Sequence, residues 1–192
     1  SRHMVYLGGF SSQRTTDRRL KLLTEAGYIQ RRKILYGVPY LYSLNYQGKA
    51  LIHTSLKEEK IRIEKITHDI SVLDTAIYFM LKYGVKQEDI LTEKELHRLD
   101  GFSTRKHQPD FVIKNQDEKT CIEVELTLKA KSRLEKNIQE NFMNYDYQKW
   151  IVPNTQIRIK NILQENSLIY PLEIMDLEEV VNYVRNYTKS DL

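Results

Sequence analysis

The fold of the amino-terminal part is decided by residues 13–46, which read QRTTDRRLKLLTEAGYIQRRKILYGVPYLYSLNY. Within this stretch Leu20, Leu23 and Ala26 recur at helical spacing and form one apolar stripe. The serines at 11 and 12 precede the stretch, and either side chain can cap a helix. Gly27 suits the left-handed position that follows a helix. A helix is therefore predicted from residue 13 to about residue 26.

Cations occupy a different face of this predicted helix. Arg14, Arg18 and Lys21 follow at i, i+4 and i+7, so their side chains share one side of it. Polar neighbours at the start of the helix have hydroxyl or amide groups that can contact bases or phosphate. The candidate contacts on the helix are Gln13, Arg14, Thr15, Thr16, Arg18 and Lys21.

A β-hairpin is predicted directly after the helix. Its strands cover residues 28–36 and 40–44, and Gly37-Val38-Pro39 makes the turn. The first strand carries Arg31, Arg32 and Lys33, which could hold a phosphate backbone. A basic helix followed by a basic hairpin is typical of a winged helix, with the helix in the groove of a duplex and the hairpin on phosphate.

The distribution of charge agrees with this prediction. Residues 1–65 contain 13 lysines and arginines and 5 acids, whereas residues 66–192 contain 17 and 21. A local basic excess is expected of a phosphate-binding module. The alternative is that these cations form an ordinary solvated face of an α+β domain, and the sequence leaves that alternative open.

Composition excludes several other classes of protein. The chain has 192 residues, 41% of them hydrophobic, without a run of 18 apolar residues or a secretory signal. The single Cys121 cannot form an intramolecular disulfide and is expected in the core, and the five histidines lack the spacing of a zinc site. We expect a cytoplasmic protein, and the composition by itself indicates no definite cofactor.

Two modules are predicted along the chain. An ordinary winged helix has two further helices before its recognition helix, but only about ten residues after Met4 are available for them here. We therefore expect either an incomplete winged helix or a neighbouring element that covers the apolar stripe. A helix over residues 49–67 is expected to link the modules and to offer a dimer contact. The predicted boundaries are 4–66 and 67–192.

The second module is predicted to be an α/β domain with a mixed sheet. The pattern gives a helix from Asp69 to Gly84, three strands, a helix, and then strands alternating with helices. The three strands are expected at 90–96, 110–113 and 120–126, and the long helix at 129–144. The later elements are a strand at 150–152, a helix at 157–164, a strand at 170–175 and a helix at 177–186.

Three carboxylates of this module are predicted to converge. Asp110 opens one strand, and Glu123 and Glu125 share one face of the next strand, opposite Ile122 and Val124. Crowded carboxylates repel one another unless a hard cation such as Mg²⁺ lies among them. Such a site supports metal-dependent phosphodiester hydrolysis. The alternative is that the alternating glutamates form a solvent-facing side of the strand.

The order of elements and these acids resemble the PD-(D/E)XK nuclease superfamily. The resemblance implies that Asp110 and Glu123 bind metal, and that Glu93 or Glu95 supplies an optional first acid. The family's lysine is replaced here by Glu125, as in some restriction endonucleases of the superfamily. Lys129 or Lys131 could then supply the positive charge.

For several other polar and aromatic side chains, the sequence leaves open a functional role and a structural role. His68, Asp69 and His107 could support the carboxylates, although a lone histidine is more often structural. Tyr145, Tyr147 and Trp150 could stack on bases but are more often found packed at the edge of a sheet.

Most of residues 14–155 also resembles the bacterial replication-relaxation family of plasmids and conjugative elements. The residues that carry the resemblance are Arg18-Arg19-Leu20, Leu23, Ala26-Gly27-Tyr28-Ile29, Tyr42-Ser43-Leu44, Gly48, His68-Asp69-Ile70, Pro109-Asp110 and Glu123-Val124-Glu125, before a helix that ends near Tyr145. The resemblance implies an accessory DNA-binding protein of plasmid replication, mobilisation or their control.

Three hypotheses follow. The first is a sequence-selective protein that binds double-stranded DNA as a homodimer. Its nuclease-like module is then non-catalytic or at most weakly catalytic and serves as a platform for DNA, for a partner or for self-association. The second is a Mg²⁺-dependent endonuclease with Asp110, Glu123 and Glu125 as ligands and Lys129 as charge stabiliser. The third is an interaction protein that binds no nucleic acid.

Overall fold

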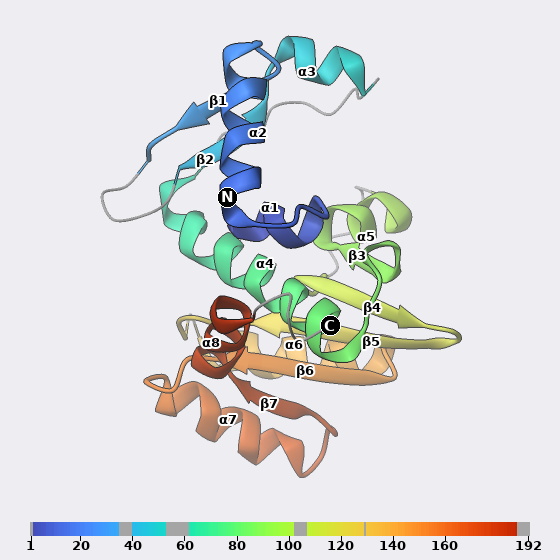
Figure 1. Cartoon of the computed structure of the whole chain (residues 1–192). Coiled ribbons are helices and arrows are strands. Elements are labelled where there is room, and N and C mark those ends of the chain that lie inside the picture. The colour runs from blue at the N-terminus through green and yellow to red at the C-terminus, as the bar shows by residue number, and fades with distance from the viewer. Residues whose placement is uncertain (1, 35–39, 53–61, 102–106, 129, 188–192) are drawn as a thin grey trace. The chain divides into compact units, whose positions relative to one another are not determined.

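The chain folds into two compact units, residues 1–67 and 68–191, which we call the amino-terminal and carboxyl-terminal units. The computed structural model describes residues 2–34, 40–52, 62–101, 107–128 and 130–187 (Figure 1). The described residues of the two units form helices with a two-stranded and a five-stranded sheet, which makes this an α+β protein. No described helix has the length and apolar character needed to cross a bilayer.

The amino-terminal unit is built on one helix beside a hairpin (Figure 1). Its elements are α1 (Arg2–Leu7), α2 (Gln13–Glu25), β1 (Ile29–Arg32), β2 (Leu41–Leu44) and α3 (Tyr46–Leu51). The oxygen of Ser12 accepts the Thr15 N–H at 3.2 Å and caps α2, and Gly27 follows the helix with φ +77°. Helix α2 therefore begins and ends as predicted.

The apolar stripe of α2 is shorter than predicted. Leu20 is buried, but Leu23 is 41% exposed and Ala26 is exposed as well. Thr16, one turn before Leu20, takes the second buried position of the helix. The short helix α1 precedes α2, where an ordinary winged helix has two helices.

The hairpin pairs β1 antiparallel to β2, with Ile29 opposite Leu44 and Arg31 opposite Tyr42. Its first strand ends at Arg32, four residues before the predicted end. The predicted turn at 37–39 lies outside the described residues. Alternation along β1 places Arg31 and Arg32 on opposite faces of the hairpin.

Helix α3 begins earlier than predicted. The Asn45 side chain accepts the Gly48 N–H at 3.0 Å and donates to the Gly27 carbonyl, so Asn45 caps a helix that begins at Tyr46 rather than at the predicted residue 49. The Tyr28 carbonyl lies 2.1 Å from the place where a Cβ on Gly48 would be, so only glycine fits there. The predicted linker helix over 49–67 is wrong at its start, and residues 53–61 lie outside the description.

Helix α4 (Ile63–Tyr83) runs without a break through residues 67–69, where a boundary between two helices was expected. These residues are Thr, His and Asp, and the helix contains neither glycine nor proline. The prediction followed a change in hydrophobic pattern, which does not by itself interrupt backbone hydrogen bonds.

The five strands of the carboxyl-terminal unit lie side by side in the order β3-β4-β5-β6-β7. Strands β3, β4 and β5 are antiparallel, whereas β5, β6 and β7 are parallel. The mixed sheet is therefore confirmed. The elements after α4 are β3 (Ile90–Thr92), α5 (Glu93–Asp100), β4 (Phe111–Asn115), β5 (Glu118–Val124), α6 (Lys131–Asn144), β6 (Tyr147–Val152), α7 (Ile157–Ser167), β7 (Glu173–Asp176) and α8 (Leu177–Asn186), with a 3₁₀ turn at Gln87–Asp89.

The strand predicted over 90–96 is wrong in its second half, because helix α5 starts at Glu93. Thr92 accepts the Glu95 N–H, and the Glu95 carboxylate accepts the Thr92 N–H at 2.8 Å. This reciprocal pair is a capping box, which fixes the start of a helix.

Helices cover both faces of this sheet (Figure 1). On one face, α6 and α7 pack their apolar residues against Trp150 and Val152 of β6. On the other face, Phe79 of α4 meets Phe111 of β4 edge to face, with ring centroids 6.3 Å apart. Cys121 is buried near Leu96, as the sequence predicted.

Candidate functional site

Helix α2 presents an exposed cationic surface. Arg14 and Arg18 are both exposed, as the helical spacing predicted, and Arg19 is exposed beside them. These arginines line a hollow of about 320 Å³ together with Thr15 and Leu22, and we call it the arginine hollow. The described residues that line it include no acid. Arg19 was not among the predicted contacts, although its position one residue after Arg18 places it within the same surface.

The two threonines at the start of α2 are less available than predicted. Thr16 is 0% exposed, and its hydroxyl donates to the Ser12 carbonyl at 2.9 Å. It is therefore a structural residue, and its prediction as a DNA contact is wrong. The Thr15 hydroxyl is half-buried and lies 3.0 Å from the Ser12 hydroxyl. Gln13 is exposed, so its side chain stays a candidate contact.

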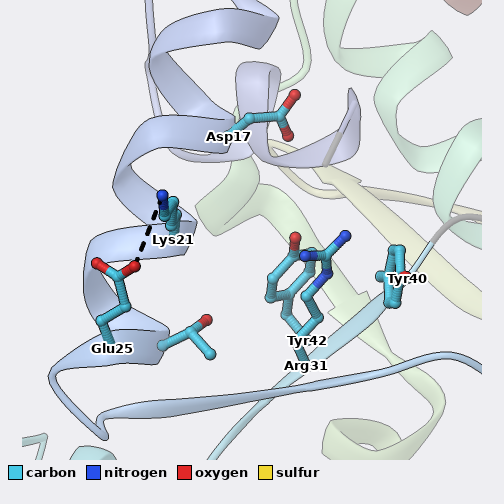
Figure 2. Close-up of a pocket in the computed structure, with 7 residues that line it drawn as sticks. Asp17, Lys21, Glu25, Arg31, Tyr40 and Tyr42 are labelled. Atoms are coloured by element: carbon cyan, nitrogen blue, oxygen red, sulfur yellow. Dashed lines mark ion pairs between the residues drawn. The ribbon is translucent and has the colours of Figure 1, made fainter.

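A second and larger hollow of about 630 Å³ lies between α2 and the hairpin (Figure 2). We call it the hairpin hollow. Its lining contains acids, cations and aromatic rings. The lining residues are Asp17, Lys21, Thr24, Glu25, Arg31, Tyr40 and Tyr42.

The cations of the hairpin hollow differ from those of the arginine hollow in their surroundings. Lys21 pairs with Glu25 across one helical turn, with Nζ and Oε1 3.7 Å apart. The Arg31 guanidinium lies over the ring of Tyr40, 3.5 Å from its centroid, which is a cation–π contact (Figure 2). Lys21, predicted to share a face with Arg14 and Arg18, therefore lines a different hollow from these arginines, and Glu25 partly balances its charge.

The cations predicted for the wing do not all lie on one face of the hairpin. Arg31 faces the hairpin hollow, whereas Arg32 lies on the other face of the strand and donates to the Gln30 side chain at 2.8 Å. Lys33 follows the strand. All three cations are exposed, so each can reach a polyanion from its own side of the hairpin.

In the carboxyl-terminal unit, Asp110 and Glu123 lie near each other at the start of β4 and the end of β5. Asp110 accepts the Val124 N–H at 2.7 Å. His68 of α4 places its Nε2 atom 3.3 Å from the Asp110 carboxylate and 3.1 Å from the Val124 carbonyl. The first predicted carboxylate is therefore held by the backbone of the neighbouring strand and by a histidine.

Glu123 has its own pair of side-chain partners. His107 Nε2 lies 2.5 Å from Glu123 Oε1, and Asn141 of α6 donates to the same oxygen at 2.9 Å. Glu123 is 7% exposed, so the interpretation of its strand face as solvent-facing is wrong, because α6 covers that face. We call His68, His107, Asp110, Glu123 and Asn141 the histidine–carboxylate cluster.

Hydrogen bonds, charges and burial within the cluster shift the pKa values of His68, His107 and Glu123. The hydrogen bond to Asp110 raises the pKa of His68, and nearby carboxylates add to this effect. Burial alone would lower the pKa of His107, but the hydrogen bond and charge of Glu123 outweigh burial and raise it. Burial raises the pKa of Glu123. All three groups therefore hold their protons more tightly than they would in an unfolded chain.

The remaining predicted groups of the carboxylate site lie elsewhere. Glu95 belongs to the capping box of α5, and Glu93 lies 3.7 Å from His97. Lys131 pairs with Glu135 and with Glu165, the latter at 3.3 Å. The partners of Glu95, Glu93 and Lys131 named here therefore lie outside the cluster.

Glu125 lies just beyond the end of β5, and its backbone N–H donates to the Ile151 carbonyl at 3.0 Å. Lys129 lies outside the described residues. Among the residues that the structure describes, no group of three or more His, Cys, Asp or Glu side chains is placed to hold a metal ion. The geometry thus shows two carboxylates with histidine partners rather than three that share a cation.

The aromatic candidates divide between the core and the surface. Trp150 is fully buried and donates to the Gln148 side chain at 3.0 Å. Tyr145 is half-buried and donates to Gln108 at 3.2 Å. Tyr147 is 53% exposed and donates to Glu118. Packing in the sheet therefore accounts for Trp150, and the half-buried Tyr145 lies beside the sheet core.

The comparisons with known proteins give no relative. No family model, curated protein or solved structure matches this chain.

Proposed function

We propose that the chain binds double-stranded DNA through its amino-terminal unit. The observation that carries the proposal is the arginine hollow, where Arg14, Arg18 and Arg19 stand exposed on one helix without an acid among the described lining residues. Arginine is the side chain best suited to phosphate and to the guanine edge, because its guanidinium donates in a planar fork. A winged-helix arrangement gives this helix access to a groove.

The hairpin supports the same proposal. Arg31, Arg32 and Lys33 are exposed on and beside β1, on both of its faces. Cations that flank a groove-binding helix neutralise phosphates and release counterions, which gives affinity independent of sequence. Helix and hairpin would thus both supply cations for the phosphate backbone, and exposed polar side chains of the helix would remain for contacts with bases.

The carboxyl-terminal unit would serve as a platform for DNA, for a partner or for self-association. A homodimer is part of the proposal, because two copies of a winged helix can read two half-sites of an operator. The proposal follows the resemblance to the replication-relaxation family and includes an accessory role in plasmid replication, mobilisation or their control, in the cytoplasm.

The experiment is a fluorescence anisotropy titration of the full chain against a labelled mixed-sequence duplex of about 24 base pairs, at low salt. Replacing Arg14, Arg18 and Arg19 together by alanine is expected to weaken binding at least tenfold. The matched control replaces Lys114, Lys119 and Arg158, three exposed cations of the carboxyl-terminal unit, which changes the net charge equally. Equal losses in both variants would contradict the proposed surface, and no binding by the unaltered chain would contradict the function.

A second candidate is a metal-dependent endonuclease of the PD-(D/E)XK type. The observation in its favour is that the fold brings Asp110 near Glu123, within a helix, antiparallel strands, helix and strand order. Their histidine partners and the position of Lys131 count against it. Incubation of supercoiled plasmid with the chain and Mg²⁺ or Mn²⁺ decides between the candidates. Nicking that Asp110→Ala abolishes would establish the enzyme.

A further inference from the structure

Helix α2 carries an acid inside its cationic surface. Asp17 lies three residues after Arg14 and four before Lys21, so these three side chains are neighbours on one side of the helix. Asp17 is exposed and lines the hairpin hollow, and no described residue forms an ion pair with it (Figure 2). Lys21, the nearest following cation, pairs instead with Glu25.

An exposed acid in this place opposes the binding of phosphate. A negative charge among cations repels the DNA backbone and lowers affinity for every sequence equally. The arginine hollow shows that the same helix can present cations without an acid. Asp17 therefore has a cost for DNA binding that no ion pair with a described residue offsets.

A carboxylate in a DNA groove contributes favourably to binding only where it accepts a hydrogen bond from a donor. The major groove offers one such group at each C·G pair, the N4 amino group of cytosine, which aspartate and glutamate accept from. The hairpin hollow also holds the Arg31 guanidinium over the ring of Tyr40, so a flat cationic surface faces the same space. An acid, a ring and a guanidinium can all contact a base, and of these three the acid has no favourable contact with phosphate.

We infer that Asp17 is a specificity-determining residue, which accepts a hydrogen bond from a cytosine amino group while the arginine hollow holds the phosphate backbone. This inference rests on the proposed function and extends it. The two hollows beside α2 would then have separate tasks, since one gives affinity and the other selects sequence. In a duplex without this cytosine, the Asp17 carboxylate would face a hydrogen-bond acceptor or a phosphate. The repulsion would lower the affinity of the chain for that duplex.

The experiment is a selection from duplexes with a randomised central segment, followed by sequencing, with the unaltered full chain and with Asp17→Asn. The unaltered chain is expected to enrich a C·G pair at one position. Asp17→Asn should reduce that preference about tenfold and bind the unselected pool more tightly. The control is Asp117→Asn, an exposed acid of the carboxyl-terminal unit, which changes the net charge equally and should leave the preference unchanged.

The outcomes separate this inference from the function on which it rests. If the unaltered chain retains no duplex, the proposed function fails. If it retains duplexes but Asp17→Asn enriches the same sequences, or if it enriches none, the inference fails and phosphate binding remains. A circular dichroism melt of each variant shows that folding is unchanged, which is expected for an exposed side chain.

Discussion

The two units of the chain use their charges in opposite ways. In the amino-terminal unit Arg14, Arg18 and Arg19 are exposed, and they contribute little to the packing of the helix that carries them. In the carboxyl-terminal unit Glu123 is buried, and its carboxylate is held by His107 and by an asparagine of the adjacent helix. Substitution of the exposed cations is therefore expected to leave the chain folded, whereas substitution of the buried Glu123 or of its partners is expected to destabilise it.

The largest expected effect is on the stability of the carboxyl-terminal unit. His107→Ala leaves Glu123 buried without its closest partner, and we expect the free energy of unfolding to fall by about 3 kcal/mol. Trp150 is the only tryptophan and is buried in this unit, so its fluorescence during urea denaturation reports the change. Arg18→Ala is the contrast and should change the same transition by less than about 0.5 kcal/mol. Equal effects of the two variants would contradict the difference proposed between the buried and the exposed charged groups.

The next effect tests whether the units can be destabilised separately. Gly48→Ala forces a Cβ against the Tyr28 carbonyl, and we expect it to cost the amino-terminal unit about 2 kcal/mol. Because Trp150 lies in the other unit, its fluorescence transition should stay in place while part of the helical circular dichroism signal melts earlier. A shift of the tryptophan transition by the same amount would show that the units unfold together.

A smaller effect is expected from the hairpin. Replacing Arg31, Arg32 and Lys33 together by alanine should weaken duplex binding about tenfold for every sequence and flatten its dependence on salt. Restoring Arg31 alone should recover part of the affinity, since it acts from the face of Tyr42 and α2. Anisotropy titrations at several salt concentrations measure both changes. An unaltered salt dependence would remove the hairpin from the interface.

The smallest effect is a pH dependence confined to the carboxyl-terminal unit. His68, His107 and Glu123 all have raised pKa values in the folded chain, so the folded state binds more protons than the unfolded state. Their stabilising contribution is present at lower pH and is lost as pH rises through the folded pKa values. The urea midpoint of the tryptophan transition should therefore be higher at pH 6 than at pH 8. A midpoint that rises with pH would contradict this sign.

Local signals in the sequence were enough to predict several elements. Helix α2 was predicted because its cap at Ser12 and its glycine at 27 lie next to each end, and the predicted bounds of the last helix, 177–186, agree with α8. Helix α5 was missed, although Thr92 and Glu95 have the spacing of a capping box, because the apolar residues around them also suit a strand.

The functional residues were harder to predict where they depend on tertiary contacts. The acids Asp110 and Glu123 could be found from their strands, but the burial of Glu123 depends on α6 and on Asn141, which come later in the chain. Thr16 was predicted to be exposed because helical spacing alone does not show which side packs. The sequence places Arg19 and Asp17 on the predicted helix, but it does not show the hollows that they line, and these hollows make both residues candidates for contacts.

The most direct test of the central claim is the salt dependence of duplex binding by the unaltered chain and by the variant that lacks Arg14, Arg18 and Arg19. We predict that the logarithm of the binding constant falls linearly with the logarithm of salt concentration, and that the variant loses roughly 2 to 3 units of that slope. The variant that lacks Lys114, Lys119 and Arg158 should keep the slope of the unaltered chain. Identical slopes for all three proteins would contradict the assignment of DNA binding to helix α2.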